Sequence, residues 1–511
     1  MKNLVVCFDG TWNMPEQEEN GVAAPTNVVK LYNSLADKSA DGDTQLKYYH
    51  PGVGTEHDNL KKQMGGMFGY GIAMHIKSAY FWLGKNFQKD EDDRIYLFGF
   101  SRGAFTVQSL SALINYKGIP DLRRKDSKSS WEIVDSIYDE YKDRDFSEPA
   151  PSSGVPIHFL GLWDMVGALG IPDTKAILNL FDTGNNWKYH DGNLQNNVKY
   201  ARHAMAVDEW RASFTVSRWN NADECKMAGI DVKELWFSGV HSDVGGGYYD
   251  SALSDCALEW MIQEGEKCNL GIRAEAKEFI NPDPCGAMHN SLKGIFKKLR
   301  SRPRNIPAVV RSNKEEFYSG VFERQNKSPI SYPPYHTTVI LQPGDEKTVE
   351  IFADKRWNYT GIYLEQGGEY YFSAEGEWVD LHDSCDWKGT DDGRLTIADI
   401  TKSASSFLGS IEKLFHSVSG NNQSDFYLTK RIEDFPWFIL VGAVCNDSGS
   451  VDSVANDGSP VPHFYFKMPD YEQNSLIIDT PGYLYCFPND VWSLYENNHG
   501  SIQLTVKRKN D

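Results

Sequence analysis

The 511-residue chain has little of three features that would assign a protein to a class at once. No stretch approaches about 18 uninterrupted apolar residues, so no transmembrane helix is predicted. The eight cysteines are scattered without a C-x-x-C pair, which predicts reduced thiols and neither a zinc site nor a disulfide framework. Positive charge is scarce too. With 52 Lys+Arg against 71 Asp+Glu the net charge is −19, which argues against nucleic acid or anionic lipid held by a general basic surface.

The N-terminus also lacks a secretion signal. Its apolar run stops at Asp9, which is too short for the hydrophobic region of a signal peptide, and no small-residue cleavage site follows. We therefore predict synthesis in the cytoplasm without a signal peptide, with export of the folded chain left open. A hydrophobic content of 40% and a charged content of 24% are ordinary for a folded protein, and this length allows two large domains.

The first half of the chain, to about residue 260, alternates short β-rich runs with helical patterns. The predicted strands are 4–8, 45–49, 94–98, 157–162 and 234–240, and predicted helices include 27–36, 74–87 and 104–114. This alternation predicts an α/β fold, a mostly parallel sheet with helices on both faces. A basic patch at 293–304 is interpreted as solvated surface.

After Tyr332-Pro333-Pro334 the chain changes to short β-rich segments separated by Gly, Asn, Asp and Pro turns, which predicts an all-β sandwich. Within it, residues 405–420 have apolar side chains at helical spacing, so an inserted amphipathic helix is predicted. The predicted domains are therefore an α/β-hydrolase unit at 1–335, with a variable, lid-like part at 262–330, and a sandwich at 336–511.

The strongest motif is Gly99-Phe100-Ser101-Arg102-Gly103, a G-x-S-x-G. An apolar run at 95–98 leads into it and a helical pattern begins at Ala104, which is the strand–turn–helix order of a nucleophile elbow. In such an elbow the serine is the nucleophile, and the backbone N–H of Arg102 faces the oxyanion. The alternative is an inert serine in a tight turn.

A nucleophilic serine needs a base and an orienting acid, which in this fold follow in the order acid, then histidine, at later strand ends. The predicted strand 157–162 leads to Asp164, and the predicted strand 234–240 leads to His241. We therefore predict a Ser101, His241 and Asp164 triad. Asp243 is a rival acid. Further candidates with weaker context are His203, Asp208 and His289.

The first predicted strand ends in Phe8-Asp9-Gly10-Thr11. A glycine turn beyond a central strand can supply a second oxyanion N–H, here from Gly10 or Thr11. Asp9 fits a structural turn acid equally well. No cofactor is predicted for catalysis.

Five motifs together resemble a known family. They are Cys7-Phe8-Asp9-Gly10-Thr11-Trp12-Asn13, Gly99-Phe100-Ser101-Arg102-Gly103-Ala104, Gly161-Leu162-Trp163-Asp164, Ala206-Val207-Asp208-Glu209 and Trp236-Phe237-Ser238-Gly239-Val240-His241-Ser242-Asp243-Val244-Gly245-Gly246-Gly247-Tyr248. In this order they resemble the α/β-hydrolase domain of type VI secretion phospholipase effectors, over about residues 1–340. The resemblance implies an esterase on glycerophospholipids that is injected into a neighbouring cell, with a secretion spike and an immunity protein as partners.

Residues 349–508 resemble the small calcium-dependent galactose-binding lectins of bacteria, on the strength of Asn489-Asp490-Val491 and the loop at 495–501. The implied Ca²⁺ ligands are side-chain oxygens of Asp490, Asn497 and Asn498 and the carbonyls of Leu494 and Leu381. The resemblance also implies a galactose-type sugar, stacked on Trp378 or Trp492. An Asp/Asn-rich turn without metal is the alternative.

The sequence thus predicts a serine esterase or lipase of the phospholipase A type, acting as an antibacterial type VI secretion effector, with a calcium- and carbohydrate-binding C-terminal module. Two alternatives stay open. One is a catalytically silent carbohydrate-binding or assembly protein, and the other is an esterase on small or acylated-sugar substrates.

Overall fold

The fold is taken from a computed structural model of the chain. The described residues are 1–10, 17–19, 21–52, 67–144, 152–167, 192–297, 300–327, 334–380, 383–390, 430–450, 460–492 and 494–510. The predicted helix at 405–420, and the candidate residues Thr11 and Leu381, lie outside them.

The N-terminal part is built on a six-stranded sheet in the order β4-β1-β5-β6-β7-β8, and every neighbouring pair of strands is parallel. The strands are β1 (Lys2–Phe8), β4 (Thr44–His50), β5 (Arg94–Phe100), β6 (Ile157–Trp163), β7 (Val198–Ala206) and β8 (Asp231–Phe237). A small hairpin, β2 (Glu18–Glu19) with β3 (Val22–Ala23), precedes the first helix. The parallel sheet confirms the predicted fold class.

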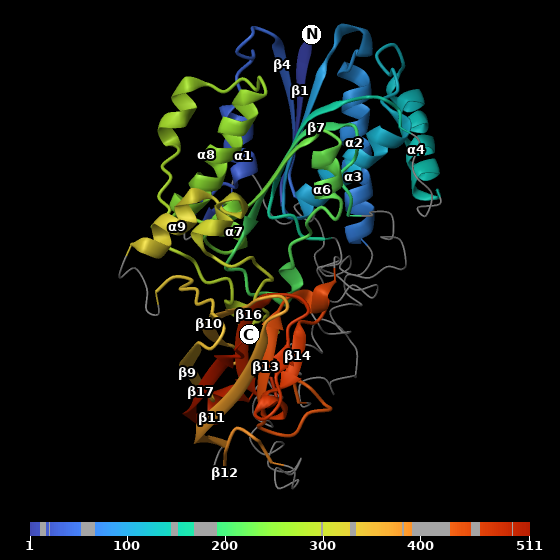
Figure 1. Ribbon diagram of the computed structural model, residues 1–511. Helices are drawn as coiled ribbons and strands as arrows, with labels where there is room; N and C mark the ends of the chain where they lie inside the picture. Colours follow the sequence, from blue (N-terminus) through green and yellow to red (C-terminus); the bar gives the residue numbers. More distant parts are fainter. Residues whose placement is uncertain are drawn as a thin grey trace.

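Helices cover both faces of this sheet (Figure 1). The described helices are α1 (Asn27–Ser34), α2 (Met67–Asn86), α3 (Arg102–Lys117), α4 (Ser127–Lys142), α6 (Ala222–Met227), α7 (His241–Gly245), α8 (Ala252–Lys267) and α9 (Ser319–Asn326). Helices α1 and α8 pack on one face and α2, α3 and α4 on the other, which gives two separate hydrophobic cores with the sheet between them.

Strand β7 was not predicted, because its sequence VKYARHAMA carries charged and polar residues inside a buried strand. Arg202 is buried there because Glu264 and Asp231 accept its N–H groups at 2.6 and 3.0 Å. His203 is buried because its Nε2 accepts the backbone N–H of Met165 at 3.1 Å. Partners distant in sequence thus make a polar segment fit a central strand.

The C-terminal part consists of two antiparallel sheets, as predicted. One has the order β10-β16-β13-β14 and the other β12-β11-β17-β9, with β15 paired to β11. The strands are β9 (Glu346–Phe352), β10 (Asn358–Leu364), β11 (Glu369–Asp380), β12 (Asp383–Cys385), β13 (Leu440–Cys445), β14 (Phe464–Lys467), β15 (Leu476–Ile477), β16 (Gly482–Pro488) and β17 (Asn498–Arg508). A hydrophobic core fills the space between the two sheets.

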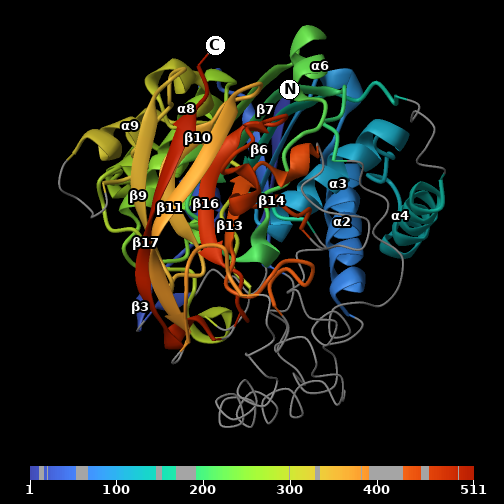
Figure 2. The ribbon, with the colours of Figure 1, turned by 60° about the horizontal axis from the view of Figure 1, so that its bottom comes forward.

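The two parts meet at the carboxyl edge of the parallel sheet. Figure 1 shows β1 starting at the far end of the molecule, so that the parallel strands run toward the C-terminal sheets, and Figure 2 shows the same contact from below. A fourth hydrophobic cluster is shared by both parts: Met205 and Trp236 belong to the parallel sheet, and Val441 and Tyr485 belong to β13 and β16. The division between residues 335 and 336 stays a prediction, although it falls within this shared contact region.

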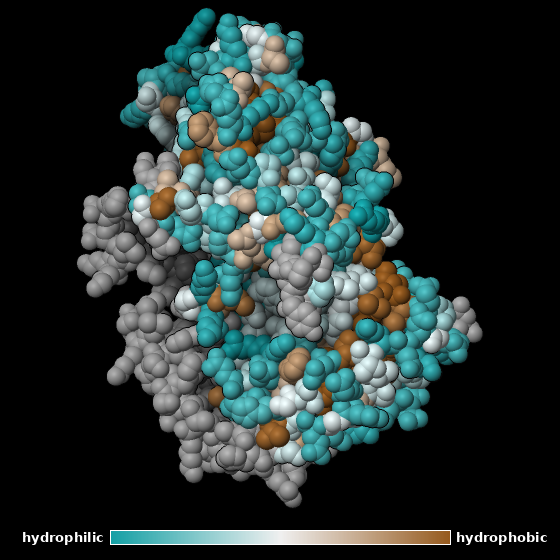
Figure 3. Space-filling view, turned by 90° about the vertical axis from the view of Figure 1, so that its left-hand side faces the viewer, coloured by the Kyte–Doolittle hydropathy of each residue, from teal (hydrophilic) through white to brown (hydrophobic). Residues whose placement is uncertain are grey.

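The surface is consistent with the acidic composition. Figure 3 shows a mostly hydrophilic face with small, separate hydrophobic patches. Within the described residues, no helix combines the length and the apolar character needed to span a bilayer. Six buried cysteines form no disulfide bond in this structure: Cys7, Cys225, Cys256, Cys268, Cys445 and Cys486.

Candidate active site

Ser101 occupies a strained turn between β5 and α3. Its backbone has φ 58° and ψ −125°, a conformation that L-residues rarely adopt and that clusters at functional sites. The turn is tight because α3 begins directly against the end of β1: a Cβ on Gly103 would lie 2.4 Å from the carbonyl oxygen of Phe8. The second glycine of the motif is therefore required by close packing, as a nucleophile elbow needs.

The neighbouring strand end supplies a carboxylate. The backbone N–H of Ser101 donates to the carbonyl of Trp163 at 3.0 Å, and Asp164 is the next residue after that carbonyl. Asp164 is fully buried, and its Oδ2 lies 2.5 Å from Nδ1 of His241. The structure thus brings together Asp164 and His241, two of the predicted triad residues, across 77 residues of sequence.

His241 lies at the start of α7, between two aromatic rings. Its imidazole is 4.6 Å from the ring of Phe100 and 5.0 Å from the ring of Phe214, measured between centroids. Phe100 directly precedes Ser101, so this contact holds the imidazole beside the elbow. Among the described residues, Ser101 Oγ makes no hydrogen bond to His241; such bonds are often long in substrate-free hydrolases and tighten when substrate binds.

The acid Asp164 is held by a residue that the sequence did not indicate. Arg304 donates from Nη1 to Oδ1 at 2.6 Å and from Nη2 to Oδ2 at 2.9 Å, and the N–H of Ala206 donates to Oδ1 at 2.8 Å. With His241, four donors fill the four acceptor positions of the carboxylate. Burial alone would raise the pKa of Asp164, but Arg304 and His241 hold it well below its usual value.

A second buried carboxylate, Glu209, fixes the backbone of the histidine. It accepts the N–H of His241 at 3.2 Å and the hydroxyl of Ser291 at 2.8 Å, and Arg211 forms a two-point ion pair with it. Burial by itself raises the pKa of Glu209, but this ion pair keeps that pKa at about 2. Burial also lowers the pKa of His241 below its ordinary value, against the opposing effect of Asp164.

The two alternate candidates pair with each other instead of joining the Ser101 site. Asp243 Oδ1 lies 2.6 Å from Nδ1 of His289, and Asp243 Oδ2 accepts the backbone N–H groups of His289 and Val240. Tyr248 stacks on His289 with centroids 3.9 Å apart. The imidazole of His241 has Asp164, not Asp243, as its acid partner.

His203 and Asp208, two of the weaker catalytic candidates, make contacts that hold the fold together. Besides its bond to Met165, His203 contacts Glu234 at 3.4 Å. Asp208 accepts from Tyr335 at 2.9 Å, and its other oxygen lies 2.8 Å from Nε2 of His336, so it joins the catalytic part to the segment that leads into the C-terminal part.

The predicted oxyanion donors are placed differently from one another. Arg102 is the first residue of α3, so its N–H belongs to the helix's first turn. The N–H of Gly10, in contrast, donates to Asp9 Oδ1 at 2.7 Å in this structure, and its role as an oxyanion donor stays a prediction. Asp9 also accepts from Thr26 and Tyr49, and burial raises its pKa to about 6. These contacts match the structural interpretation of Asp9.

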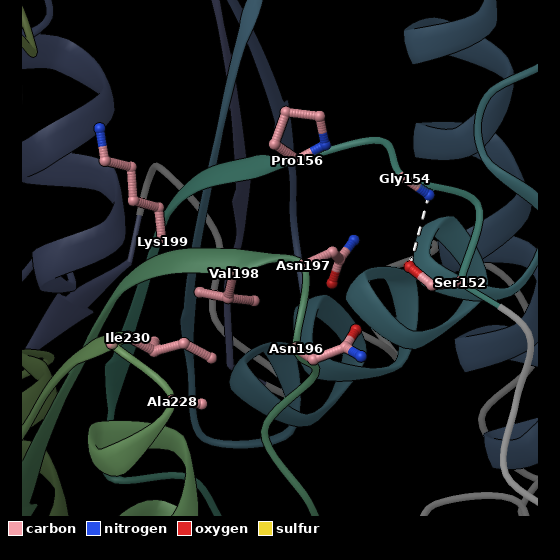
Figure 4. Close-up of a pocket in the computed structure, with 10 residues that line it drawn as sticks. Ser152, Gly154, Pro156, Asn196, Asn197, Val198, Lys199, Ala228 and Ile230 are labelled. Carbon is pink, nitrogen blue, oxygen red and sulfur yellow. Dashed lines mark hydrogen bonds between the residues drawn. The ribbon is translucent and has the colours of Figure 1, made fainter.

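A surface hollow of about 450 Å³ lies at the opposite edge of the sheet. Figure 4 shows Pro156 just before β6, Val198 at the start of β7, and Asn197 between strand and loop. These are amino ends of parallel strands, whereas Ser101, Asp164 and His241 lie beyond carboxyl ends. The hollow is therefore not part of the candidate site.

Residues of the predicted calcium loop form hydrogen bonds with other groups of the protein. Asp490 is buried; its Oδ1 accepts the N–H of Val491 at 2.6 Å and its Oδ2 accepts the side-chain N–H of Asn498 at 2.9 Å. The carbonyl of Leu494 accepts the N–H of Asn497 at 3.1 Å. No group of three or more His, Cys, Asp or Glu in the described part of the chain is arranged to hold a metal. Calcium binding stays a prediction.

The proposed sugar-stacking residues are not accessible. Trp378 is 0% exposed in the core between the two sheets, and Trp492 is 6% exposed, with the Arg356 and Arg431 guanidinium groups 5.4 and 4.7 Å from its ring. A ring must present a free face to stack on a sugar. That part of the lectin prediction is wrong.

Comparison with solved structures gives distant similarities. An uncharacterized protein from Pseudomonas aeruginosa matches 55% of this chain and 49% of its own at 18% identity, with a TM-score of 0.34. The Tle1 effector bound to the VgrG spike of the type 6 secretion system matches 100% of this chain and 69% of its own at 12% identity, with a TM-score of 0.28.

Sequence comparison is more specific. The uncharacterized protein YEL023C of Saccharomyces cerevisiae is 31% identical over 242 residues, which are 42% of this chain and 32% of the yeast protein. The chain thus matches about a third of the length of this curated relative. Residues 2–264 match the family model described as "T6SS, Phospholipase effector Tle1-like, catalytic domain". These residues include the elbow, Asp164 and His241, and the chain belongs to the Tle1-like family of type VI secretion phospholipase effectors.

Proposed function

We propose that the protein is a serine esterase of the phospholipase A type, in which Ser101 is the nucleophile, His241 the general base and Asp164 the orienting acid. The observation that carries the proposal is the 2.5 Å contact between His241 Nδ1 and Asp164 Oδ2, next to a serine held at positive φ in an elbow. Family membership supports a phospholipid as the substrate.

In the proposed reaction Ser101 Oγ attacks the carbonyl carbon of a glycerophospholipid ester, while His241 Nε2 takes the hydroxyl proton. Asp164 keeps the proton of Nδ1 in place and stabilises the imidazolium. The lysophospholipid alcohol leaves with the proton from His241, and water then attacks the acyl-enzyme with His241 again as base. The products are a lysophospholipid and a free fatty acid. The backbone N–H of Arg102 stabilises the oxyanion.

The proposal includes delivery by type VI secretion, with a secretion spike and an immunity protein as partners, and rests for this on the family alone. A calcium or carbohydrate role for the C-terminal part is not included, because the Asp490 carboxylate accepts N–H donors and both candidate tryptophans are buried.

The test is hydrolysis of vesicles of phosphatidylethanolamine and phosphatidylglycerol by the purified full-length protein, with the products identified by mass spectrometry. The wild type should release fatty acid and lysophospholipid, and Ser101→Ala should not. Ser109→Ala is the matched control, since Ser109 lies on the same helix and its hydroxyl donates to the carbonyl of Phe105 at 2.7 Å. Equal release by wild type and Ser101→Ala would contradict the proposal.

The same assay also tests the two alternative functions, an esterase on small substrates and a catalytically silent protein. If p-nitrophenyl butyrate is cleaved in a Ser101-dependent way and vesicles are not, the protein is an esterase on small substrates. If neither substrate is cleaved, the catalytically silent alternative holds.

A further inference from the structure

We propose that Arg304 is a positioning residue for the triad acid Asp164 and that the C-terminal part holds Arg304 in place, so that this part completes the active site. The inference rests on the proposed function. It goes beyond it by assigning the C-terminal sheets a role in catalysis that requires neither metal nor sugar.

The segment 301–304 lies between the two parts, and residues of the C-terminal part bond three consecutive positions of it. Trp357 Nε1 donates to the carbonyl of Ser301 at 3.0 Å. The guanidinium of Arg302 forms an ion pair with Asp447. His463 Nε2 lies 2.9 Å from the carbonyl oxygen of Pro303. We refer to Arg302, His463 and Asp447 as the Arg302 cluster.

The Arg302 cluster contains a buried histidine that is held by hydrogen bonds. His463 is 2% exposed; its Nδ1 accepts the backbone N–H of Asp447 at 3.3 Å, and its Nε2 lies 3.1 Å from Arg302 Nε as well as 2.9 Å from the carbonyl oxygen of Pro303. Burial and the nearby Arg302 lower the pKa of His463 well below its ordinary value, so the ring is neutral at physiological pH. The backbone N–H of Arg302 donates to Trp210 in the catalytic part at 2.7 Å.

The next residue, Arg304, is directed into the catalytic part. It is 9% exposed and donates to both oxygens of Asp164, to the carbonyl of Ala206 at 2.6 Å and to the carbonyl of Phe214 at 2.6 Å. A bidentate guanidinium fixes the plane of a carboxylate as well as its position. The plane of Asp164 in turn sets the ring orientation of His241, because one of the same oxygens contacts Nδ1.

The charge of Arg304 has a second consequence. The charged groups that act on the His241 imidazole are Asp164 at the end of β6 and the Glu209–Arg211 ion pair after β7. Arg304 is bonded to the same Asp164 carboxylate, while Asp243 on the helix of His241 is paired with His289. Removal of Arg304 leaves the negative charge of Asp164 less neutralised, which favours the imidazolium. The pKa of His241 should therefore rise and the acid limb of the activity should move to higher pH.

The experiment uses the full-length protein with variants in three places. Arg304→Gln and Arg304→Lys change the guanidinium itself. Asp447→Asn and His463→Gln weaken the Arg302 cluster, which touches no reacting atom. Glu369→Gln is the matched control, because it removes an ion pair with Lys509, 2.7 Å, elsewhere in the C-terminal part. Each variant is assayed for kcat, KM and pH profile at a temperature where its melting curve shows it folded.

We expect Arg304→Gln to lower kcat about 100-fold, the size of effect that a misplaced catalytic group produces, with KM little changed. Arg304→Lys should recover part of this loss, since it keeps the charge. Asp447→Asn and His463→Gln should lower kcat by about tenfold and shift the acid limb in the same direction, as smaller misplacements of the same group. Glu369→Gln should match the wild type.

The result that would overturn the proposal is a melting temperature lowered by the cluster variants while kcat and the acid limb stay at wild-type values. An unchanged acid limb in Arg304→Gln would overturn the positioning role. Failure of the proposed function is recognised separately, because the wild type would then equal Ser101→Ala. In that case the pKa of His241 is still measured from its downfield Nδ1 proton resonance, and the same variants must raise it.

Discussion

The carboxyl edge of the parallel sheet and the Asp490 loop of the C-terminal sheets both contain a buried carboxylate whose two oxygens accept hydrogen bonds. At Asp164 the donors are a guanidinium, an imidazole and one backbone N–H. At Asp490 they include a backbone N–H and the amide of Asn498. Of these donors in the described part of the chain, the imidazole at Asp164 is the one that exchanges a proton in the physiological pH range.

This difference shows that burial and a full set of donors do not by themselves mark a catalytic acid. Both carboxylates satisfy the requirement that a buried charge be hydrogen-bonded. What distinguishes Asp164 is that one donor is an imidazole and that this imidazole is held beside a strained serine. The comparison therefore predicts large effects on turnover at the sheet edge and effects on stability alone at the loop.

The largest effect should come from the nucleophile and the base. Ser101→Ala and His241→Ala should each lower kcat by about 10⁴- to 10⁶-fold, and the double variant should lose little more, because the two groups act as a unit. The rate of fatty-acid release measures this. A fully active His241→Ala protein, with activity lost instead in His289→Ala, would contradict the assignment.

The acids give the next largest contrast. Asp164→Asn should lower kcat by about 10³- to 10⁴-fold, because an amide stabilises the wrong tautomer of His241. Asp243→Asn, whose carboxylate is paired with His289, should lose less than about tenfold, as expected for a contact outside the reacting groups. Equal losses of kcat in the two variants, measured under the same conditions, would contradict the assignment of Asp164, and not Asp243, as the acid of the triad.

Gly→Ala changes at two tightly packed positions test whether the sheet edge and the C-terminal sheets respond differently in stability and turnover. A Cβ on Gly103 would meet the Phe8 carbonyl oxygen at 2.4 Å, and a Cβ on Gly442 in β13 would meet the ring of Phe466 at 2.2 Å. Each Gly→Ala change should lower the free energy of unfolding by about 1–3 kcal/mol through overpacking. Only Gly103→Ala should also lower kcat at a temperature where both variants are folded. Loss of kcat in both variants would contradict a specific catalytic role for the turn at Ser101.

A smaller effect is expected at the loop. Asp490→Ala should lower the free energy of unfolding by about 1–3 kcal/mol, because the buried amide of Asn498 loses the closer of its two acceptors and the N–H of Val491 loses its own. Thermal unfolding with and without Ca²⁺ also tests the calcium prediction. A melting temperature raised by millimolar Ca²⁺ in the wild type and not in Asp490→Ala would support the metal site. The same melting temperature with Ca²⁺ and with chelator would exclude it.

The pH profile gives the finest test of the sheet edge. His241 must be neutral to accept the proton of Ser101, and burial lowers its pKa. Protonation then requires a lower pH, so kcat/KM should stay high below the ordinary imidazole pKa of about 6.5 and fall only at more acidic pH. A midpoint above that value would mean that Asp164, not burial, dominates the environment of His241.

The sheet edge was largely predictable from the sequence because the carboxyl ends of parallel strands meet. Two short strands leading to Asp164 and His241, and one leading to Ser101, were enough to bring three distant residues into one region. This rule depends on how parallel strands are arranged in a sheet and not on distance along the sequence. It therefore applies to Asp164 and His241, which are in contact although they are 77 positions apart.

The rest was not predictable for equally physical reasons. Arg304 lies 140 residues from Asp164, in a basic segment that looks like ordinary solvated surface, and no local pattern indicates that its guanidinium is buried. In the C-terminal part, a resemblance in loop sequence suggested a sugar site at Trp378 and Trp492. Trp378 instead fills the core between the sheets, and Trp492 is buried beside the guanidinium groups of Arg356 and Arg431, because tertiary packing decides which aromatic side chains are exposed.

The most direct test of the central claim is covalent labelling with a fluorophosphonate, which forms a stable phosphonyl bond with an activated serine. Peptide mass spectrometry of the labelled full-length protein should find one adduct, on Ser101, formed much more slowly in His241→Ala and Asp164→Asn. An adduct on another residue, or hydrolysis of phospholipid by a protein whose Ser101 is not labelled, would contradict the account.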